Sequence, residues 1–299
     1  MRPTGNIAAK AILLIAGIGS LILTGAVRGS SSPPPQAAAG QPAAVPDLNV
    51  LLAKAAEYCR KLESVAFDYI CREEIAERID PNLEASPPPL PGWITGGTMW
   101  RRLPDFRNSY IYDYQCVRTG GKAREARALI ERNGKKMNVP GAILETEVFA
   151  FGNAIQGPVG LFGDRVQALY DYKIAGWDKI GSRPVVLVDS APRVPDSAAE
   201  NLYGKAWIDP ATFDILKIEW SEKGVRHYAV FEERAQKYGR KPRVTLRSEF
   251  SVEKTGIRFP SRLYLEEAYL NERGRAFVRS ETTVTYKDFK FFTVDVEVK

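Results

Sequence analysis

The chain has 299 residues, with 42 lysines and arginines against 36 aspartates and glutamates, three cysteines and a single histidine, His227. One histidine excludes zinc sites built from two or three histidines, and any Ser-His-Asp or Cys-His relay would have to use His227. The formal net charge of +6 is weak for a nucleic-acid-binding protein, because basic residues alternate with acidic ones instead of forming a stripe. The sequence therefore predicts no metal, no cofactor, no catalytic residue and no nucleic-acid partner.

The first 26 residues have the pattern of a secretory signal peptide. Arg2 and Lys10 form a basic start, an uncharged apolar run follows, and the small residues Thr24 and Ala26 precede a cleavage site. The run is short for crossing a bilayer, which takes roughly 20 apolar residues. We expect export to the periplasm with cleavage after Ala26. The alternative is an uncleaved segment that anchors the protein.

Residues 27–46 are almost entirely Ser, Pro, Ala and Gly, with hardly any large side chain to bury. Such a composition does not offset the entropy lost on ordering, so this stretch is predicted to be a disordered tether. A single folded domain should then span residues 47–299 and begin near Asp47.

A helix is expected first in the domain, at 47–63, because Asp47 is a suitable N-cap and apolar residues follow at helical spacing. After it the apolar period changes to two, which is typical of half-buried strands. We predict about eleven strands, with one or two more from 276–298. The predicted strands are 64–79, 98–104, 109–118, 122–133, 168–177, 183–191, 202–209, 213–222, 225–236, 243–254 and 259–271.

The long spacing between turn residues favours one large antiparallel sheet in up-and-down order. About eleven strands make a sheet roughly 50 Å across, which has to curl. Only two further helices are predicted, at 141–152 and 160–167, so helices can plug a rolled sheet but not cover a flat one. We expect a mainly β fold with a helical lid, a single large curved sheet forming a half-open barrel. Such a shape tends to enclose an apolar cavity; the alternative is a fully packed barrel without a ligand.

Three cysteines in an exported chain raise the question of pairing. Cys59 lies late in the predicted helix and Cys71 on the strand that follows, so a helix packed back on that strand would allow a Cys59–Cys71 disulfide. The rival pairing is Cys71–Cys116, which needs strands 64–79 and 109–118 to be neighbours.

Three segments resemble the superfamily of periplasmic lipoprotein carriers and outer-membrane lipoprotein-sorting proteins. The exported N-terminus and the order of elements, one helix followed by long strands, also resemble this superfamily. The segments are Gln156 to Phe162 followed by Tyr170 to Tyr172, Gly204 to Pro210 followed by Ile215 to Trp220, and Tyr286 to Phe292. The resemblance implies a curved half-barrel with a helical lid over a hydrophobic cavity that receives lipid or lipoprotein acyl chains.

His227 lies on predicted strand 225–236 beside apolar residues and is interpreted as a core or rim residue. The candidates for a cavity wall are large aromatic side chains, each of which core packing alone would also explain: Trp100, Tyr112, Phe162, Trp207 and Trp220. We expect a monomeric, non-enzymatic envelope protein that binds lipid or an acylated protein. The alternative is a protein-interaction or sensor module on the same fold.

Overall fold

The structure is a computed structural model that describes residues 46–83, 102–119, 122–148, 157–194, 202–225 and 228–292. All of these belong to the compact unit Val45–Lys299. The predicted signal peptide and the predicted tether up to residue 45 lie outside the described residues. Within the described part, no helix is both long and apolar enough to cross a membrane.

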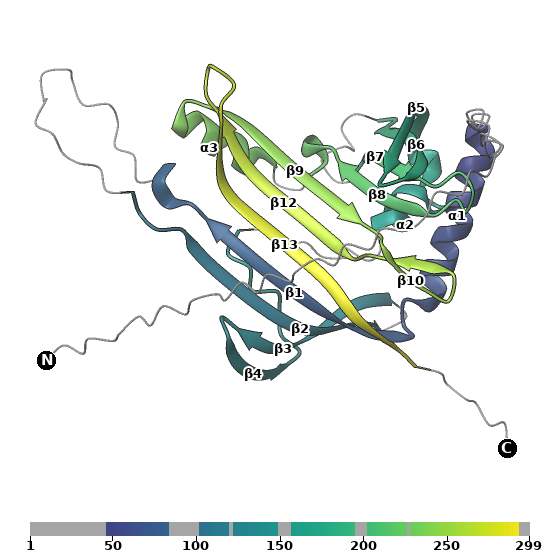
Figure 1. Ribbon diagram of the computed structural model, residues 1–299, viewed down its shortest axis with the longest axis horizontal. Helices are drawn as coiled ribbons and strands as arrows, with labels where there is room; N and C mark the ends of the chain where they lie inside the picture. Colours follow the sequence, from purple (N-terminus) through teal and green to yellow (C-terminus); the bar gives the residue numbers. More distant parts are fainter. Residues whose placement is uncertain are drawn as a thin grey trace, which may run out of the picture. The chain divides into compact units, whose positions relative to one another are not determined.

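Eleven strands form one antiparallel sheet in the order β4-β3-β2-β1-β13-β12-β9-β8-β7-β6-β5 (Figure 1). The strands are β1 (Tyr69–Ile79), β2 (Phe106–Thr119), β3 (Lys122–Arg132), β4 (Lys135–Pro140), β5 (Tyr170–Ile180), β6 (Arg183–Pro192), β7 (Gly204–Ile208), β8 (Ile215–Trp220), β9 (Lys241–Glu249), β12 (Arg262–Leu270) and β13 (Ala276–Phe291). Because β4 and β5 are the two edges and do not pair with each other, the sheet stays open. The prediction of a mainly β, half-open barrel with a helical lid is confirmed.

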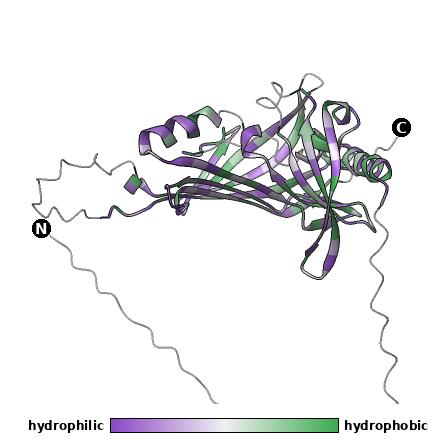
Figure 2. Cartoon of the chain, turned by 90° about the horizontal axis from the view of Figure 1, so that it is seen from above, coloured by the Kyte–Doolittle hydropathy of each residue, from purple (hydrophilic) through white to green (hydrophobic). Residues whose placement is uncertain are grey.

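Within the described ranges three helices accompany the sheet: α1 (Leu48–Val65), α2 (Gly157–Phe162) and α3 (Tyr228–Tyr238). The predicted N-cap is confirmed, since the Asp47 carboxylate accepts hydrogen bonds from the amides of Asn49 and Val50. Figure 2 shows α3 and α1, at its left and right, on the same side of the long strands. We call this side the inner face of the sheet and the opposite side the outer face.

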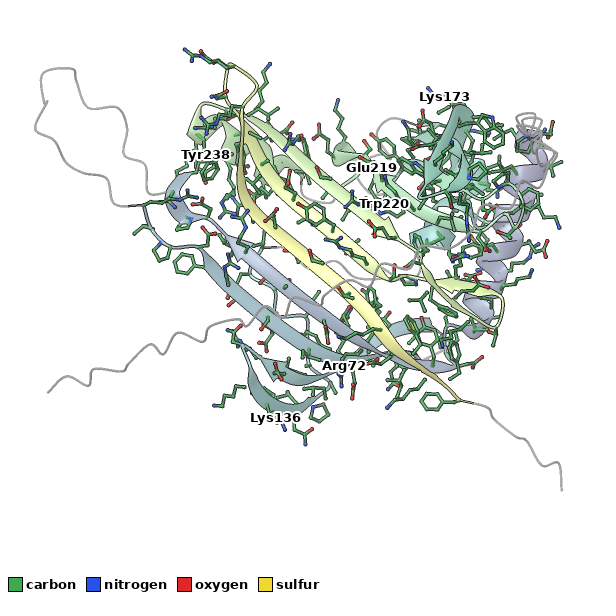
Figure 3. All side chains as sticks on the ribbon, viewed as in Figure 1. Arg72, Lys136, Lys173, Glu219, Trp220 and Tyr238 are labelled. Carbon is green, nitrogen blue, oxygen red and sulfur yellow. The ribbon has the colours of Figure 1, made fainter. Side chains whose placement is uncertain are left out.

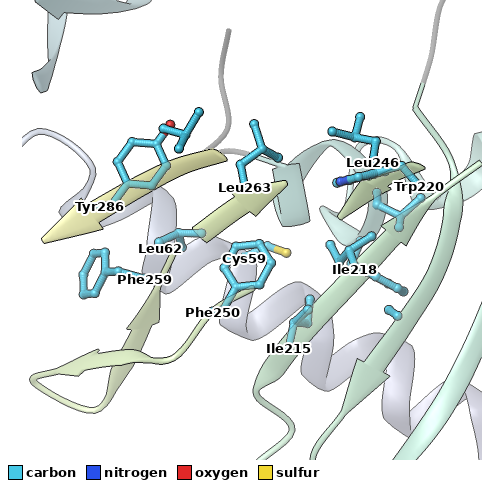
Figure 4. Close-up of a cluster of buried hydrophobic side chains, with 14 of the residues drawn as sticks. Cys59, Leu62, Ile215, Ile218, Trp220, Leu246, Phe250, Phe259, Leu263 and Tyr286 are labelled. Carbon is cyan, nitrogen blue, oxygen red and sulfur yellow. The ribbon is translucent and has the colours of Figure 1, made fainter. Parts of the chain in front are cut away.

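The core lies between the helices and the inner face. Alternate residues of the central strands point inward and meet α1, so that Cys59 and Leu62 of the helix pack with Leu246 and Leu263 of the sheet (Figure 4). A two-stranded hairpin, β10 (Val252–Lys254) and β11 (Ile257–Phe259), extends this cluster and contacts α1. The period of two that predicted the strands thus marks the residues that the helices cover.

The predicted strand 225–236 is wrong, because this segment contains helix α3. Apolar residues alternate over only a few positions there. The buried side chains of the helix, Phe231 and Ala235, are four residues apart, which is the spacing of one helix face. His227 itself lies outside the described residues, so its interpretation stays a prediction.

The predicted strand 98–104 is wrong in its described part, since residues 102–105 are irregular and β2 begins at Phe106. The predicted helix 141–152 is also wrong in its described part, because residues 141–148 contain no helix. Their backbone amides find partners on the sheet instead of in a helical turn, as described below. The predicted helix 160–167 lies earlier, as α2, and a short 3-10 turn follows at Gln167–Leu169.

The predicted strands 243–254 and 259–271 each divide in two, because the chain leaves the main sheet after Glu249 to form the β10–β11 hairpin. The predicted turn at Gly256 is found there. Thr255 and Gly256 have φ values of 51° and 73°, the conformation that a two-residue hairpin turn with the right twist requires.

Candidate functional site

Tyr112, predicted to line a ligand cavity, lies on the inner face of β2 and is fully buried. It stacks on Tyr110, with ring centroids 6.3 Å apart. Its hydroxyl accepts a hydrogen bond of 3.4 Å from the backbone amide of Glu145. Tyr112 therefore faces a segment of the chain itself that crosses the inner face.

Phe162 and Trp220 both lie where helix α2 packs on the inner face of the sheet. Phe162 of α2 stacks on Tyr172 of β5 with ring centroids 5.6 Å apart. The Trp220 indole nitrogen donates to Ser248 Oγ at 2.9 Å, and a Cβ at Gly157 of α2 would be only 3.1 Å from the ring. Helix α2 thus brings these two predicted residues into one packed region, in which both are buried.

Trp207 points to the outer face of β7, but it lines the same cleft as Trp220. It packs with Val185 and Leu216 in a separate cluster, and Lys217 Nζ lies 3.7 Å from its ring centroid. Its indole nitrogen donates to Asp178 at 2.8 Å. The cleft has a volume of about 730 Å³ and is also lined by Tyr172, so it is shared by residues of both faces of β5 to β8. Trp100 lies outside the described residues.

Residues 142–148, which we call the strap, lie over an apolar strip of the inner face. Leu144 and Thr146 of the strap, with four apolar sheet residues, line a small cavity of about 10 Å³, together with Glu73 and Thr282. The four sheet residues, which we call the apolar strip, are Ile75, Leu263, Leu265 and Val284. With the strap in place, this part of the inner face has room for no more than about one water molecule.

The strap is fixed by polar contacts between its backbone and the sheet. Glu77, which is 3% exposed, accepts hydrogen bonds from the amides of Glu147 at 3.2 Å and Val148 at 3.3 Å. The Tyr112 hydroxyl binds the amide of Glu145. These distances are at or beyond the long end of the usual range, so each bond is weak. The side chain of neighbouring Ile143 is 77% exposed and makes no comparable contact.

A buried ionic network lies beside the apolar strip. Arg127 of β3 donates to both carboxylate oxygens of Glu73 of β1, and its remaining nitrogen donates to Glu125. The hydroxyls of Tyr286 and Tyr114 donate to Glu73 and Glu125 respectively. Burial alone would lower the pKa of Arg127, but the hydrogen bonds and charges of the two carboxylates raise it. Sequence reasoning missed this network, although Glu73 falls on the buried period of its strand between Cys71 and Ile75.

A second network surrounds Glu267, which is 1% exposed. Its carboxylate accepts hydrogen bonds from Arg279 and Ser280 of β13, from Tyr269 of β12 and from Arg234 of α3. Both carboxylate oxygens are therefore occupied by partners from the protein itself. Among the described residues, no group of His, Cys, Asp and Glu side chains is arranged to hold a metal ion.

All three cysteines are buried free thiols, so the structure does not contain the predicted Cys59–Cys71 disulfide. Helix α1 packs against α2 instead of folding back on β1, and Cys59 Sγ donates to the backbone oxygen of Pro158. The rival pairing of Cys71 with Cys116 required their strands to be neighbours. Strands β1 and β2 are neighbours, but Cys71 and Cys116 are also free thiols.

No protein-family model and no curated protein matches the chain. Among solved structures, it is similar to a DUF1329 family protein from Desulfovibrio piger at 10% identity and a TM-score of 0.38, over 83% of this chain and 95% of that one. A LolA superfamily protein from Nitrosomonas europaea has 10% identity and a TM-score of 0.34, over 82% and 94% of the two chains. A domain named for outer-membrane lipoprotein sorting, from Vibrio parahaemolyticus, has 11% identity and a TM-score of 0.35, over 82% and 95%.

The second and third of these structures belong by name to the superfamily that the sequence motifs resemble. At this degree of likeness, the function of the chain has to follow from its own geometry.

Proposed function

We propose that the chain is a monomeric, non-enzymatic binding protein of the cell envelope, whose inner sheet face receives an acyl chain of a lipid or of an acylated protein. The observation that carries this proposal is the apolar strip beneath the strap. An irregular segment covers the strip. Three long hydrogen bonds and one of 2.9 Å, from the Ala142 amide to the Arg127 carbonyl, hold the backbone of that segment, and Glu145 pairs with Arg132 at 3.0 Å. When the strap moves away, the strip becomes an apolar groove.

Exchange of the strap for an acyl chain replaces the contacts of the strap by the burial of methylenes. The four backbone hydrogen bonds of the strap described above contribute about 0.5–1.5 kcal/mol each, because water replaces them on release, and the exposed ion pair of Glu145 with Arg132 adds no more than about 1 kcal/mol. An acyl chain gains about 0.8 kcal/mol for each buried methylene, so ten methylenes gain about 8 kcal/mol. Because the cavity under the strap measures only about 10 Å³, binding requires displacement of the strap.

The buried carboxylates support a role without catalysis. Arginine and tyrosine side chains fill the hydrogen-bonding positions of Glu73 and Glu267. A general acid or base needs a free position within reach of a substrate proton. These carboxylates are therefore assigned to the architecture of the inner face.

Binding of cis-parinaric acid, a fluorescent fatty acid, tests the proposal. Leu144→Ala removes the apolar contact of the strap with the strip, and we expect it to bind the probe about tenfold more tightly than the unmodified protein. Ile143→Ala is the matched control, because this neighbouring side chain is exposed and its truncation leaves the strap contact intact.

Lipid extraction and native mass spectrometry of protein purified from its own envelope provide the second measurement. The proposal is rejected if the protein carries no lipid and neither the unmodified protein nor Leu144→Ala binds the probe. Equal effects of the two truncations would place the binding site elsewhere than under the strap.

The envelope location is proposed from the sequence pattern of residues 1–26. N-terminal sequencing of the protein recovered from a periplasmic fraction should begin at Val27. A protein that starts at Met1 and sediments with membranes would support the alternative of an uncleaved anchor.

A protein-binding module is the second candidate, and the strap contacts favour it. The inner face already binds an irregular stretch of polypeptide, since Glu77 and Tyr112 hold strap amides. Two buried hydroxyls on the same face, of Tyr110 and Thr282, have no hydrogen-bond partner in the described structure. An extended segment of a partner protein would find acceptors and donors there. Photo-crosslinking from position 143 to a single stoichiometric envelope protein, with no bound lipid, would favour this candidate.

A further inference from the structure

One transverse row of residues crosses the outer face over nine strands. Each member is the registered partner of the next, and paired residues in an antiparallel sheet point to the same face. From β5 to β2 the row is Lys173, Asp189, Lys205, Glu219, Arg247, Tyr264, Thr283, Ala76 and Ser109. Figure 3 labels two members, Lys173 and Glu219. This face is opposite to the strap, and Glu77 is the residue that takes part on both sides of the sheet.

The two halves of the row differ in chemistry. From Lys173 to Arg247 the side-chain charges alternate in sign, so each charge in this half of the row is compensated by that of its partner on the next strand. The last three positions, Thr283, Ala76 and Ser109, have small side chains. A run of small residues across three adjacent strands leaves a depression between taller side chains on either side. A groove of about 710 Å³ lies at this place, and we call it the outer groove.

The walls of the outer groove are charged. On one side, registered residues of β13, β1 and β2 place Glu281, Arg78 and Arg107 next to one another. On the other side stands Arg262 of β12. Arg78 is neutralised by Glu281 at 2.7 Å and Asp105 at 3.3 Å. The wall therefore contains a satisfied ion-pair cluster and two further guanidinium groups.

Those two guanidinium groups, of Arg107 and Arg262, have no carboxylate partner among the residues that the structure describes. Both residues are exposed. Arg262 lies over the Tyr264 ring, 5.7 Å from its centroid, and makes no ion pair there. The lining contains three arginines and two glutamates, Glu281 and the buried Glu77, whose carboxylate accepts hydrogen bonds from strap amides. The guanidinium groups of Arg107 and Arg262 are thus the exposed charges of the outer groove that can bind carboxylates through two parallel hydrogen bonds.

The remaining lining of the outer groove is rich in hydroxyl and amide groups. Ser109 and Thr283 form the floor, and Asn108 and Asn133 close one end. The Asn133 amide oxygen accepts a hydrogen bond from the backbone of Ser109 at 2.7 Å, which fixes this end. These hydroxyl and amide groups can form hydrogen bonds with the hydroxyls of a sugar chain. The two arginines without a carboxylate partner can bind acidic substituents of that chain.

We propose that the outer groove binds an acidic oligosaccharide, a sugar chain that carries carboxylates. The groove runs across the strands, so its floor offers no strand edge with which a peptide backbone would pair. The guanidinium groups of Arg247 and Arg262 lie over the Tyr264 ring, 5.5 Å and 5.7 Å from its centroid, so they already occupy the aromatic surface on which a nucleobase would stack.

Titration calorimetry of the purified protein with an oligogalacturonide, which has one carboxylate on every sugar ring, tests the proposal. We expect binding that weakens as salt is raised, and a loss of about tenfold in affinity for each of Arg107→Gln and Arg262→Gln. Arg273→Gln is the matched control, because this exposed arginine lies in the turn between β12 and β13 and is not part of the groove.

Two further probes separate sugar recognition from simple charge attraction. Neutral maltohexaose should bind much more weakly than the oligogalacturonide, and so should hexaglutamate. The proposal is overturned if the oligogalacturonide does not bind, if hexaglutamate binds equally well, or if Arg273→Gln weakens binding as much as the groove variants. None of these results depends on fatty-acid binding, which is measured on the opposite face.

Discussion

Arg127 donates to both carboxylate oxygens of Glu73, from Nε at 2.6 Å and from Nη2 at 3.0 Å, and so joins β3 to β1 across the intervening strand β2. The two side chains are 8% and 1% exposed. Because neither charge reaches water, each depends on the other for compensation. The pair therefore ties together the part of the sheet over which the strap lies.

Removing one partner of this pair should strongly destabilise the fold. Arg127→Met leaves the Glu73 carboxylate buried with only the Tyr286 hydroxyl as a partner, and we expect it to lower the free energy of unfolding by about 3–5 kcal/mol. Urea denaturation measures this change. The double variant Glu73→Gln/Arg127→Met, in which position 73 no longer carries a buried charge and Glu125 keeps the Tyr114 hydroxyl, should recover at least about 1 kcal/mol.

Arg132→Met is the control on the same strand. Its ion pair with Glu145 has side chains that are 45% and 37% exposed, so its loss should change stability by no more than about 1 kcal/mol. An equal effect of the two arginine variants would contradict the assignment of Arg127 to a buried network.

Gly204 should not tolerate a side chain. A Cβ at this position would lie 2.1 Å from the backbone oxygen of Glu219 and 2.9 Å from Cα of Trp220 on the neighbouring strand β8. Gly204→Ala therefore has to push β7 and β8 apart, and we expect a loss of about 1–3 kcal/mol in urea denaturation.

Gly160 of α2 is the matched position, because a Cβ there meets no atom within 4 Å. Gly160→Ala should leave stability unchanged or raise it by about 0.5–1 kcal/mol, as is usual for this exchange in a helix. A Gly204→Ala variant as stable as Gly160→Ala would show that β7 and β8 are not as close as described.

Long strands could be predicted from the sequence because their signal is local. On β1 and β9, alternate residues are buried over most of the strand, and the pattern is visible in the letters themselves. The same signal failed at 225–236, where alternation over a few residues coincides with the face of α3. A short alternating run fits the period of a strand and also that of a helix, and only the contacts of Phe231 decide between the two structures.

The strap and the ionic networks could not be predicted, because they depend on which distant segments meet. Glu77 binds amides some seventy positions later in the chain, and Tyr286 reaches Glu73 because the last strand pairs with the first. The Cys59–Cys71 prediction failed for the same reason: the packing partner of α1 is α2, which follows about a hundred residues later. Trp207 was expected inside because its residue type gives no indication of which sheet face it occupies.

The three cysteines should be unreactive in the folded protein. Burial raises the pKa of the thiols of Cys59, Cys71 and Cys116, and only the thiolate reacts with iodoacetamide. At pH 8 we expect no labelling of the native protein and three labels after unfolding in urea, counted by mass spectrometry. Labelling of the folded protein, or a mass lower by two hydrogens that reveals a disulfide, would contradict the structure.

The raised thiol pKa values also set the direction of a pH effect. The fold favours the neutral thiols, so their contribution to stability is fully present below the pKa of an unfolded cysteine, about 8.5. It declines as the pH rises above that value, because the unfolded chain then ionises and the folded chain does not. Urea denaturation at pH 7 and pH 10 should show this loss, and a variant with all three cysteines replaced by alanine should lose less stability between the two pH values.

Helix α3 should depend on Arg234 for its position over the sheet. Arg234 Nη1 donates to the Glu267 carboxylate at 3.0 Å and is the ionic contact of this helix with the buried network. Arg279 and Ser280 remain on Glu267 when Arg234 is removed, so Arg234→Ala should loosen α3 without exposing an unpaired charge. We expect faster amide hydrogen exchange in 228–238 and little change in β13. Glu233→Ala, at an exposed position of α3, should leave exchange unchanged. If Arg234→Ala also left it unchanged, the ring contact of Tyr238 with Tyr269 and the burial of Phe231 would be sufficient to hold the helix.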